Sequence, residues 1–472
     1  MGNGYGGAPH GTISRFLFTI CYFLFPVDIM PHVIASVSFA FLITVGCAAQ
    51  GADLVQIYRT AQTSDAQYAA ARATWAAGQE RLPQGRAGLL PSVSISASTQ
   101  YNDREIRFRD PTIPDNNATF NSNTASVSLS QPIYRPENFK VFEQAKTQVA
   151  QADAVLAQAA QDLILRVAQA YFDVLLTQDT VAFAQAQLQA IGQQLEQAKR
   201  NFEVGTATIV DTKEAQSRYD LTRAFEIQAK NEVEVRKRFL ELIIGQPAPG
   251  LSPLGKRFKP APPDPNNHEK WVSRAAEGNV QVKIAERSFT FATQEVERNR
   301  TGHLPTLDAF ASYTDSGSGA ASQTSVGSDT RNAIVGVQLA IPIYQGGSVS
   351  SKVREAIANA EKARQDLENA RRTAELTARQ RFLGVTSRTA QIQALEAALV
   401  SSESSLASTV LGQEVGVRTQ VDVLNATQQV SETRRDLAEA RYAYILALLQ
   451  LKATAGTLTE ADVVAVNSWL DK

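Results

Sequence analysis

The sequence predicts a mainly α-helical fold with membrane β-strands, in which one strand–strand–long-helix unit occurs twice. Three observations support this fold class. Landmark residues recur in the same order at an offset of about 210 residues, which indicates an internal duplication. Two pairs of short segments alternate apolar and polar residues, as membrane strands do. The segments that follow them carry apolar residues at the heptad spacing of coiled coils.

The composition disfavours one large class of protein. The chain has 472 residues, enough for two or three domains, and its 46 basic and 47 acidic residues nearly cancel. A nucleic-acid binder usually has a basic excess or a basic stripe, so no nucleic-acid partner is expected. A low aromatic content with abundant Ala and Gln suits long helices better than a thick apolar core.

Residues 1–51 are interpreted as a leader region. From Met30 the sequence has a short polar start, an apolar run over 33–45 and then small residues, as in a secretory signal peptide. The run is too short for a transmembrane helix, which needs about 20 apolar residues. Met30 is a plausible true start, and cleavage is expected between Ala49 and Ala52.

The two cysteines, Cys21 and Cys47, both precede the expected cleavage site. The mature chain would then have no disulfide and no thiol chemistry. An alternative is a lipoprotein acylated on Cys47, although Thr44 is a poor residue three places before it.

The duplication divides the chain into repeat 1, 52–262, and repeat 2, 263–472, with a Pro-rich stretch over 247–265 at the junction. Each repeat begins with a helix. Repeat 1 continues with expected strands 92–102 and 123–134 and long helices 136–204 and 208–245. Repeat 2 continues with expected strands 305–314 and 331–343, long helices 348–412 and 419–454, and a C-terminal equatorial segment. The segments 103–122 and 315–330 are predicted to be exposed loops between strands.

The strand segments show the period of two that membrane strands require. Val93, Ile95 and Ala97 alternate with serines, and Val335 and Val337 alternate in the same way in repeat 2. Each run reaches about 10 residues, the length of a tilted membrane-spanning strand. A soluble hairpin is the alternative interpretation.

The helical segments are too long and too polar to lie in a bilayer. Apolar residues recur every seven positions at Phe142, Val149, Leu156 and Leu163, and no Gly or Pro interrupts 137–191. A helix over 137–203 would be roughly 100 Å long. Such a helix must run through water.

Four membrane strands cannot close a barrel, because open edges in lipid leave unpaired N–H and C=O groups that cost several kcal/mol each. If the strands span a membrane, the protein must therefore be an oligomer. Two, three or four subunits would give eight, twelve or sixteen strands, and the pattern does not choose among them.

From about Asp53 to its C-terminus the chain resembles the TolC family of outer-membrane factors. The resemblance rests on five stretches in the family's order and spacing: 53–58 (DLVQIY), 89–91 (LLP), 131–134 (QPIY), 415–427 and 440–444 (ARYAY). It implies a homotrimer with a twelve-stranded barrel in the outer membrane and a long coiled-coil α-helical barrel through the periplasm. It also implies a periplasmic adaptor protein and an inner-membrane pump, either ABC-type or proton-driven. The expected function is an exit duct for type I protein secretion or for efflux of small toxic compounds.

The duplicated motif VGTATIVD over 204–211 and VGVRTQVD over 415–422 predicts two helix–turn–helix tips. Gly205 and Gly416 allow the first helix of each pair to end, and Thr208 and Thr419 can cap the second. An aspartate follows each threonine by three positions, where a capping box usually has Glu or Gln. As hinge and capping residues, these positions have a sufficient structural explanation.

The resemblance adds a gate at these turns. In the family this end is a closed constriction lined by acidic residues, and an arginine bonds to neighbouring groups when it is shut. Arg418 matches that arginine, Asp211 matches its acidic partner and Asp422 matches one aspartate of the ring. Asn425 stands where a second ring aspartate would be, and Gln413 replaces a tyrosine of the closure network, so a weaker ring and a looser latch are expected.

No catalytic constellation, metal site or cofactor motif is found. His268 and His303, the histidines of the expected mature chain, are not at zinc-ligand spacing, and no Gly-rich phosphate loop occurs. The chain is therefore expected not to be an enzyme. The competing interpretation is a periplasmic coiled-coil scaffold or adaptor with no membrane span.

Overall fold

The computed structural model describes residues 51–319 and 326–471. The expectations for the leader, namely the start at Met30, its cleavage and the fate of Cys47, lie outside these residues, as does part of the expected loop 315–330.

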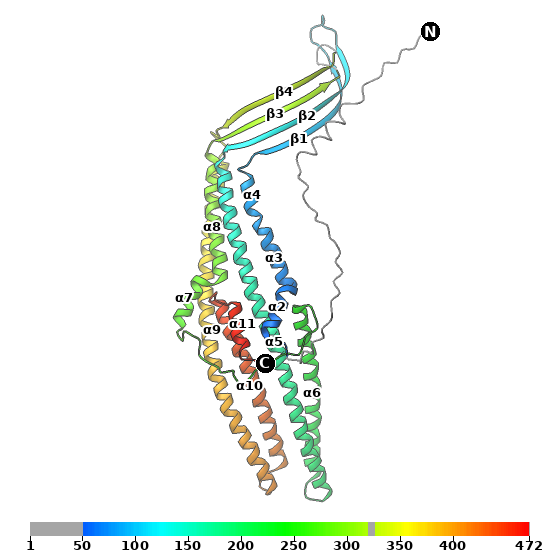
Figure 1. The fold of residues 1–472 in the computed structure, drawn as a ribbon, viewed down its shortest axis with the longest axis vertical. Coiled ribbons are helices and arrows are strands. Elements are labelled where there is room, and N and C mark those ends of the chain that lie inside the picture. The colour runs from blue at the N-terminus through cyan, green and yellow to red at the C-terminus, as the bar shows by residue number, and fades with distance from the viewer. Residues whose placement is uncertain (1–50, 320–325, 472) are drawn as a thin grey trace, which may run out of the picture. The chain divides into compact units, whose positions relative to one another are not determined.

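The strands form one antiparallel sheet in the order β1-β2-β3-β4 (Figure 1). β2 pairs with β3 across the two repeats, so the duplication is joined within a single sheet. The bounds of the strands are β1 Ser92–Ile106, β2 Asn116–Tyr134, β3 Thr306–Ser318 and β4 Ser328–Ala340.

The strands β1 and β2 extend into the segment 103–122 that was expected to be a loop. Asp103 pairs with Thr119 and Ile106 with Asn116, so the connection is confined to 107–115. The sequence pattern did not reveal these strand ends, because their side chains are mostly polar on both faces. The hydrogen bonds that join the two strands come from the backbone and leave no such pattern. β4 ends at Ala340 rather than 343, since Pro342 has no N–H to donate to a ladder.

The register aligns apolar residues from all four strands in rows on one face. Ile95 lies opposite Val127, which lies opposite Tyr313, which lies opposite Ala333. The adjacent row on the same face is Val93, Leu129, Ala311 and Val335. The other face carries the polar row Ser96, Ser126, Thr314 and Asn332. The alternation seen in single strands is therefore an apolar band across the sheet.

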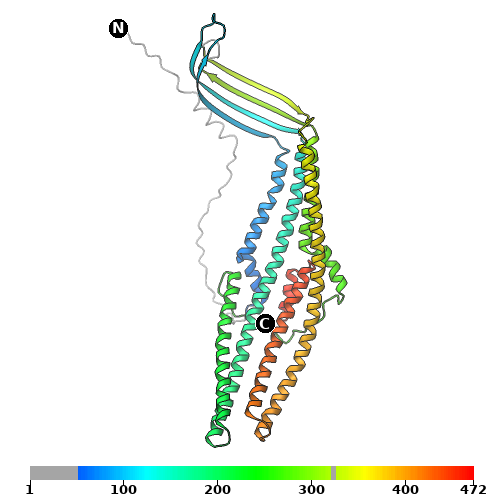
Figure 2. The ribbon, with the colours of Figure 1, turned by 180° about the vertical axis from the view of Figure 1, so that it is seen from behind.

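The long helices start at one end of the strands and run away from the sheet as two hairpins (Figure 2). The first pairs α5 (Pro136–Glu203) with α6 (Ile209–Ile244), and the second pairs α9 (Ser348–Glu414) with α10 (Gln420–Thr454). α5 begins directly after β2 and, with 68 residues, is about 100 Å long, so its turn lies far from the strands. Within the described residues, no helix has both the length and the apolar character needed to cross a membrane.

Shorter helices pack along the long ones. α3 (Ala66–Gln79) and α4 (Arg81–Ala87) lie against α5, and α8 (Val280–Arg300) lies between α5 and α9. α8 leads through the 3-10 helix η1 (Thr301–His303) into β3. Three further helices lie near the middle of the long helices (Figure 1): α2 (Leu54–Ser64), α7 (His268–Gly278) and α11 (Glu460–Asn467).

The main core is formed where the inter-repeat linker, α2 and the C-terminal residues 458–470 pack against α5 and α10. Tyr171 and Phe172 of α5 are fully buried there, and the Phe172 ring lies 5.7 Å from that of Tyr442. The Tyr171 hydroxyl donates to the carbonyls of Ser252 at 2.8 Å and Ala52 at 3.2 Å. This one side chain thus fixes both the linker and the segment at Ala52 to the long helix.

Candidate functional site

The turns between the paired helices have the same backbone geometry in both repeats. Gly205 and Gly416 have φ angles of 80° and 82°, and open space surrounds the position of a Cβ at each. The left-handed backbone, not crowding, is therefore what requires glycine. The N–H groups of Thr206 and Val417 donate back to the carbonyls of Asn201 and Gly412, both at 2.8 Å, which closes the end of the first helix.

A capping box starts the second helix of each hairpin. Thr208 Oγ1 accepts from the N–H of Asp211 at 3.2 Å, and the Asp211 carboxylate accepts from the N–H of Thr208 at 2.9 Å. Thr419 and Asp422 make the same two bonds, at 3.2 and 2.9 Å.

The hydrogen bonds from Thr208 hold the pKa of Asp211 below its ordinary value, and those from Thr419 do the same for Asp422. Both carboxylates are therefore charged at neutral pH. Each serves its own helix start and still adds a negative charge to the tip.

Arg418 lies in the turn itself, two residues after Gly416. Its side chain packs over Gly412, where a Cβ would come within 2.7 Å of the Arg418 Cγ. Within the described residues Arg418 makes no ion pair with Asp211, which belongs to the other hairpin. Gln413 donates from Nε2 to Oε1 of Gln420, so it joins the two ends of its own turn rather than the two hairpins.

Asn425 has a partner that the sequence did not suggest. Arg218 of α6 donates from one guanidinium nitrogen to Oδ1 of Asn425 at 3.2 Å and from another to Oε1 of Gln428 at 2.8 Å. Arg218 follows Asp211 by seven residues, two helical turns further along nearly the same face. That spacing was the only sequence signal that Arg218 lies near the gate residues. The partner of Arg218, Asn425, lies 207 residues away and could not be predicted.

A small apolar cluster sits between the hairpins close to these polar contacts. Leu424 of α10 is 2% exposed and packs among residues of α5 and α6. Its neighbours are Ile191, Leu195, Ala198, Ala215 and Tyr219. Near their tips the two hairpins are thus joined by the Leu424 cluster, by the hydrogen bonds of Arg218, and by a hydrogen bond that Gln194 donates to the Thr427 hydroxyl at 3.4 Å.

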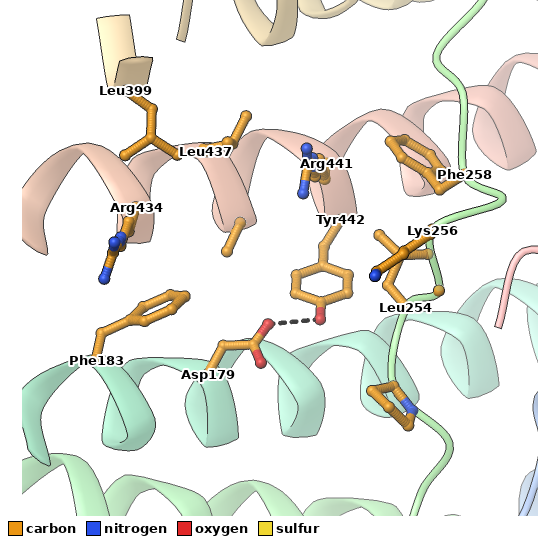
Figure 3. A pocket seen from close by; sticks show the side chains of 13 residues that line it. Asp179, Phe183, Leu254, Lys256, Phe258, Leu399, Arg434, Leu437, Arg441 and Tyr442 are labelled. Atoms are coloured by element: carbon orange, nitrogen blue, oxygen red, sulfur yellow. Dashed lines mark hydrogen bonds between the residues drawn. The ribbon is translucent and has the colours of Figure 1, made fainter. Parts of the chain in front are cut away.

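A cavity of about 510 Å³ lies nearer the main core, between α5, α9, α10 and the linker (Figure 3). Tyr442 donates to Asp179 at 2.7 Å across it, and burial raises the pKa of the Asp179 carboxyl. Lys256 and Arg441 reach the same space. None of these residues formed a recognisable sequence motif, because they come from three separate elements.

Comparison with known proteins agrees with this architecture. The sequence family described as "Outer membrane efflux protein" matches residues 57–246 and 271–457, one segment in each repeat. The outer membrane protein TolC of Vibrio cholerae is 33% identical over 429 residues, which cover 90% of this chain and 96% of that protein. The proteases secretion protein PrtF of Dickeya chrysanthemi is 31% identical over 430 residues, covering 90% and 92%.

A solved structure shows the same fold at lower identity. The CmeC outer membrane channel of Campylobacter jejuni superposes with a TM-score of 0.73 at 15% identity, over 89% of this chain and 90% of that one. The expected outer-membrane location is confirmed by the relatives, and an adaptor without a membrane span is thereby excluded. The chain belongs to the outer membrane efflux protein family and is an outer-membrane exit duct.

Proposed function

We propose that three copies of the chain form one continuous passive duct, with twelve strands in the outer membrane and six helical hairpins in the periplasm. The observation that supports this most directly is the sheet, which has an apolar face and, among the described residues, two unpaired edges, β1 and β4. Ile95 on β1 is 64% exposed and Val335 on β4 is 85% exposed in the single chain. Such a sheet needs lipid on its apolar face and a neighbouring strand on each edge.

The edges are complementary rather than identical, so β1 of one subunit pairs with β4 of the next. Repetition of this head-to-tail contact closes a ring and leaves no edge. The polar row that contains Ser96 and Asn332 then lines the interior, and the row that contains Ile95 faces lipid.

Cysteine cross-linking tests both the pairing and the number of subunits. The described residues contain no cysteine. Ser96→Cys in β1 is combined in turn with single cysteines at alternate β4 positions from Asn332 to Gln338, and the two single-cysteine proteins serve as controls. We expect an oxidised ladder that ends at three subunits. A ladder that ends at two or four, or no cross-link in any pair, would contradict the trimer.

The hairpin turns are proposed to close the inner end of the duct. Arg418 and Asp211 lie on different hairpins and do not pair within one chain, so their contact would form between neighbouring subunits. A charge-assisted bond suits this role because it is strong yet can be exchanged for contacts with another protein. Arg418→Ala should raise single-channel conductance in planar bilayers, and unchanged conductance would exclude the role of this pair.

Three copies of Asp422 would place like charges around the inner mouth and favour entry of cations. Asp422→Asn removes the charge while it retains an acceptor for the N–H of Thr419. We expect lower cation selectivity in reversal-potential measurements. If selectivity is unchanged, Asp422 does not line the narrow part of the duct.

The duct itself supplies no energy, so we propose that it works with a periplasmic adaptor and an inner-membrane pump. The name of PrtF refers to secretion of proteases. By that likeness this chain would carry exported proteins, or small toxic compounds if its pump is of the drug-exporting kind. Co-purification with the adaptor after mild cross-linking tests the partnership, and no catalytic activity is expected.

A further inference from the structure

Arg218 is the one side chain of α6 that hydrogen-bonds to α10 within the described residues. Its guanidinium group spans Asn425 and Gln428, which are three positions apart on α10 and therefore share one helix face. Gln428 in turn donates from Nε2 to Glu432 at 2.8 Å. A short polar network thus runs from the first hairpin onto the second.

We propose that Arg218 is a positioning residue that latches the α5–α6 hairpin to α10 within each subunit and thereby favours the closed duct. This inference rests on the proposed gate at the hairpin turns. It differs from the Arg418–Asp211 contact, which would join neighbouring subunits. Arg218 would instead set how far the two hairpins of one subunit can separate.

The position of Arg218 suits a latch. α6 and α10 touch only over a short stretch, whereas α5 packs extensively along α10. Arg218 follows the N-cap Thr208 by ten residues, so it lies roughly 15 Å above the turn. Leu424 seals the apolar side of the same junction. Any motion that moves the tip of α10 away from α6 must break both Arg218 hydrogen bonds.

The choice of acceptors makes the latch releasable. Both partners are neutral amide oxygens, so the guanidinium group gains directed hydrogen bonds without the attraction of a full countercharge. A carboxylate at position 425 would convert the contact to an ion pair. The presence of Asn425 therefore keeps the closing force low and removes one negative charge from the inner mouth.

Two substitutions with opposite predicted effects test the latch in the full-length oligomer. Arg218→Gln removes the charge and the pair of guanidinium donors that bind Asn425 and Gln428 together. We expect the ratio of open to closed time in planar bilayers to rise roughly two- to fivefold per subunit. Asn425→Asp adds a carboxylate within reach of Arg218, and the same ratio should fall. Arg218→Lys, which keeps the charge but not this pair of donors, should restore part of the closure.

The matched control is Arg223→Gln, which removes the same charge from an exposed arginine of the same helix. In the Arg218→Gln background, Asn425→Asp should no longer favour closure, because the pair acts as one unit. Equal open ratios for Arg218→Gln, Arg223→Gln and the unaltered protein would overturn the latch. Failure of the unaltered protein to conduct would instead overturn the proposed duct.

Discussion

Leu424→Ala tests whether the apolar cluster near the tips holds the two hairpins together. The Leu424 side chain is 2% exposed and inserts among Ile191, Leu195, Ala198 and Ala215. Leu→Ala substitutions in packed sites cost about 2–5 kcal/mol. Two of the neighbours are alanines, which cannot reorient to fill space, but the cluster is small and close to water. We therefore expect about 2–3 kcal/mol, which is a roughly 30- to 150-fold change in the equilibrium between packed and separated hairpins.

Hydrogen–deuterium exchange measures this equilibrium locally. Peptides that cover 191–219 and 420–432 should exchange faster in the Leu424→Ala protein by a factor in that range, because separation exposes their amides. Peptides around Tyr171 should be unaffected, since the main core is a separate cluster. Leu411→Ala, which truncates a leucine that is 61% exposed on the neighbouring α9, is the control. Equal exchange in the Leu424→Ala and Leu411→Ala proteins would refute the assignment of Leu424 as the anchor.

Two further predictions concern backbone strain and pH. Gly416→Ala and Gly205→Ala should each destabilise the hairpin turn by about 1–2 kcal/mol, because φ angles near 80° are costly for any L side chain. Gly384→Ala, at an open position inside α9, should instead stabilise the protein by up to about 1 kcal/mol. A thermal-melting series that fails to show these opposite signs would contradict the strain at the two turn glycines. Burial raises the pKa of Asp179, which accepts from Tyr442 in a cavity also lined by Lys256, Arg434 and Arg441. The contribution of Asp179 to stability is therefore present below its ordinary pKa of 3.8 and is lost as pH rises through the raised value. Asp179→Asn keeps an acceptor for Tyr442 and should raise the melting temperature at pH 7 but not below pH 4; an equal shift at both pH values would show that the charge is irrelevant.

The sequence allowed the elements of each repeat to be placed because their signals are local. Heptad spacing identified α5, and the motif around Gly205 located its turn within a few residues. The strand ends were less predictable. Asp103 and Thr119 pair through their backbones, and their side chains carry no trace of that pairing. Alternation of apolar and polar residues marks a strand only where one of its faces is apolar, so the pattern is lost where both faces of the strand are polar.

Contacts between hairpins lay beyond the sequence for a different reason. Whether Arg218 meets Asn425 depends on the rotation of α6 and α10 about their axes and on their relative height, neither of which local spacing determines. The same applies to Asp179 and Tyr442, which meet across a cavity from distant elements. Gln413 stands where the family has a tyrosine of the closure network, and its side chain binds Gln420 within its own turn. A helix end offers it a partner nearer than the next hairpin does.

The internal repeat nevertheless provides a comparison within one chain. At the offset that relates Gly205 to Gly416, the glycine, threonine and aspartate of the turn occur twice, and all three have backbone roles in both copies. Arg418 corresponds to Ala207 at the same offset, so the fold of the turn does not require an arginine.

Arg218 corresponds to Gln429, which donates a hydrogen bond to Thr433 of its own helix and, within the part of the chain that the structure describes, makes none to the other hairpin. The turn residues with backbone roles are therefore repeated, whereas Arg218 and Arg418 have no arginine at the matching position of the other repeat. Since the turn does not need Arg418 and the second repeat has no arginine that matches Arg218, this asymmetry is what we expect if both arginines serve the contacts between hairpins proposed above.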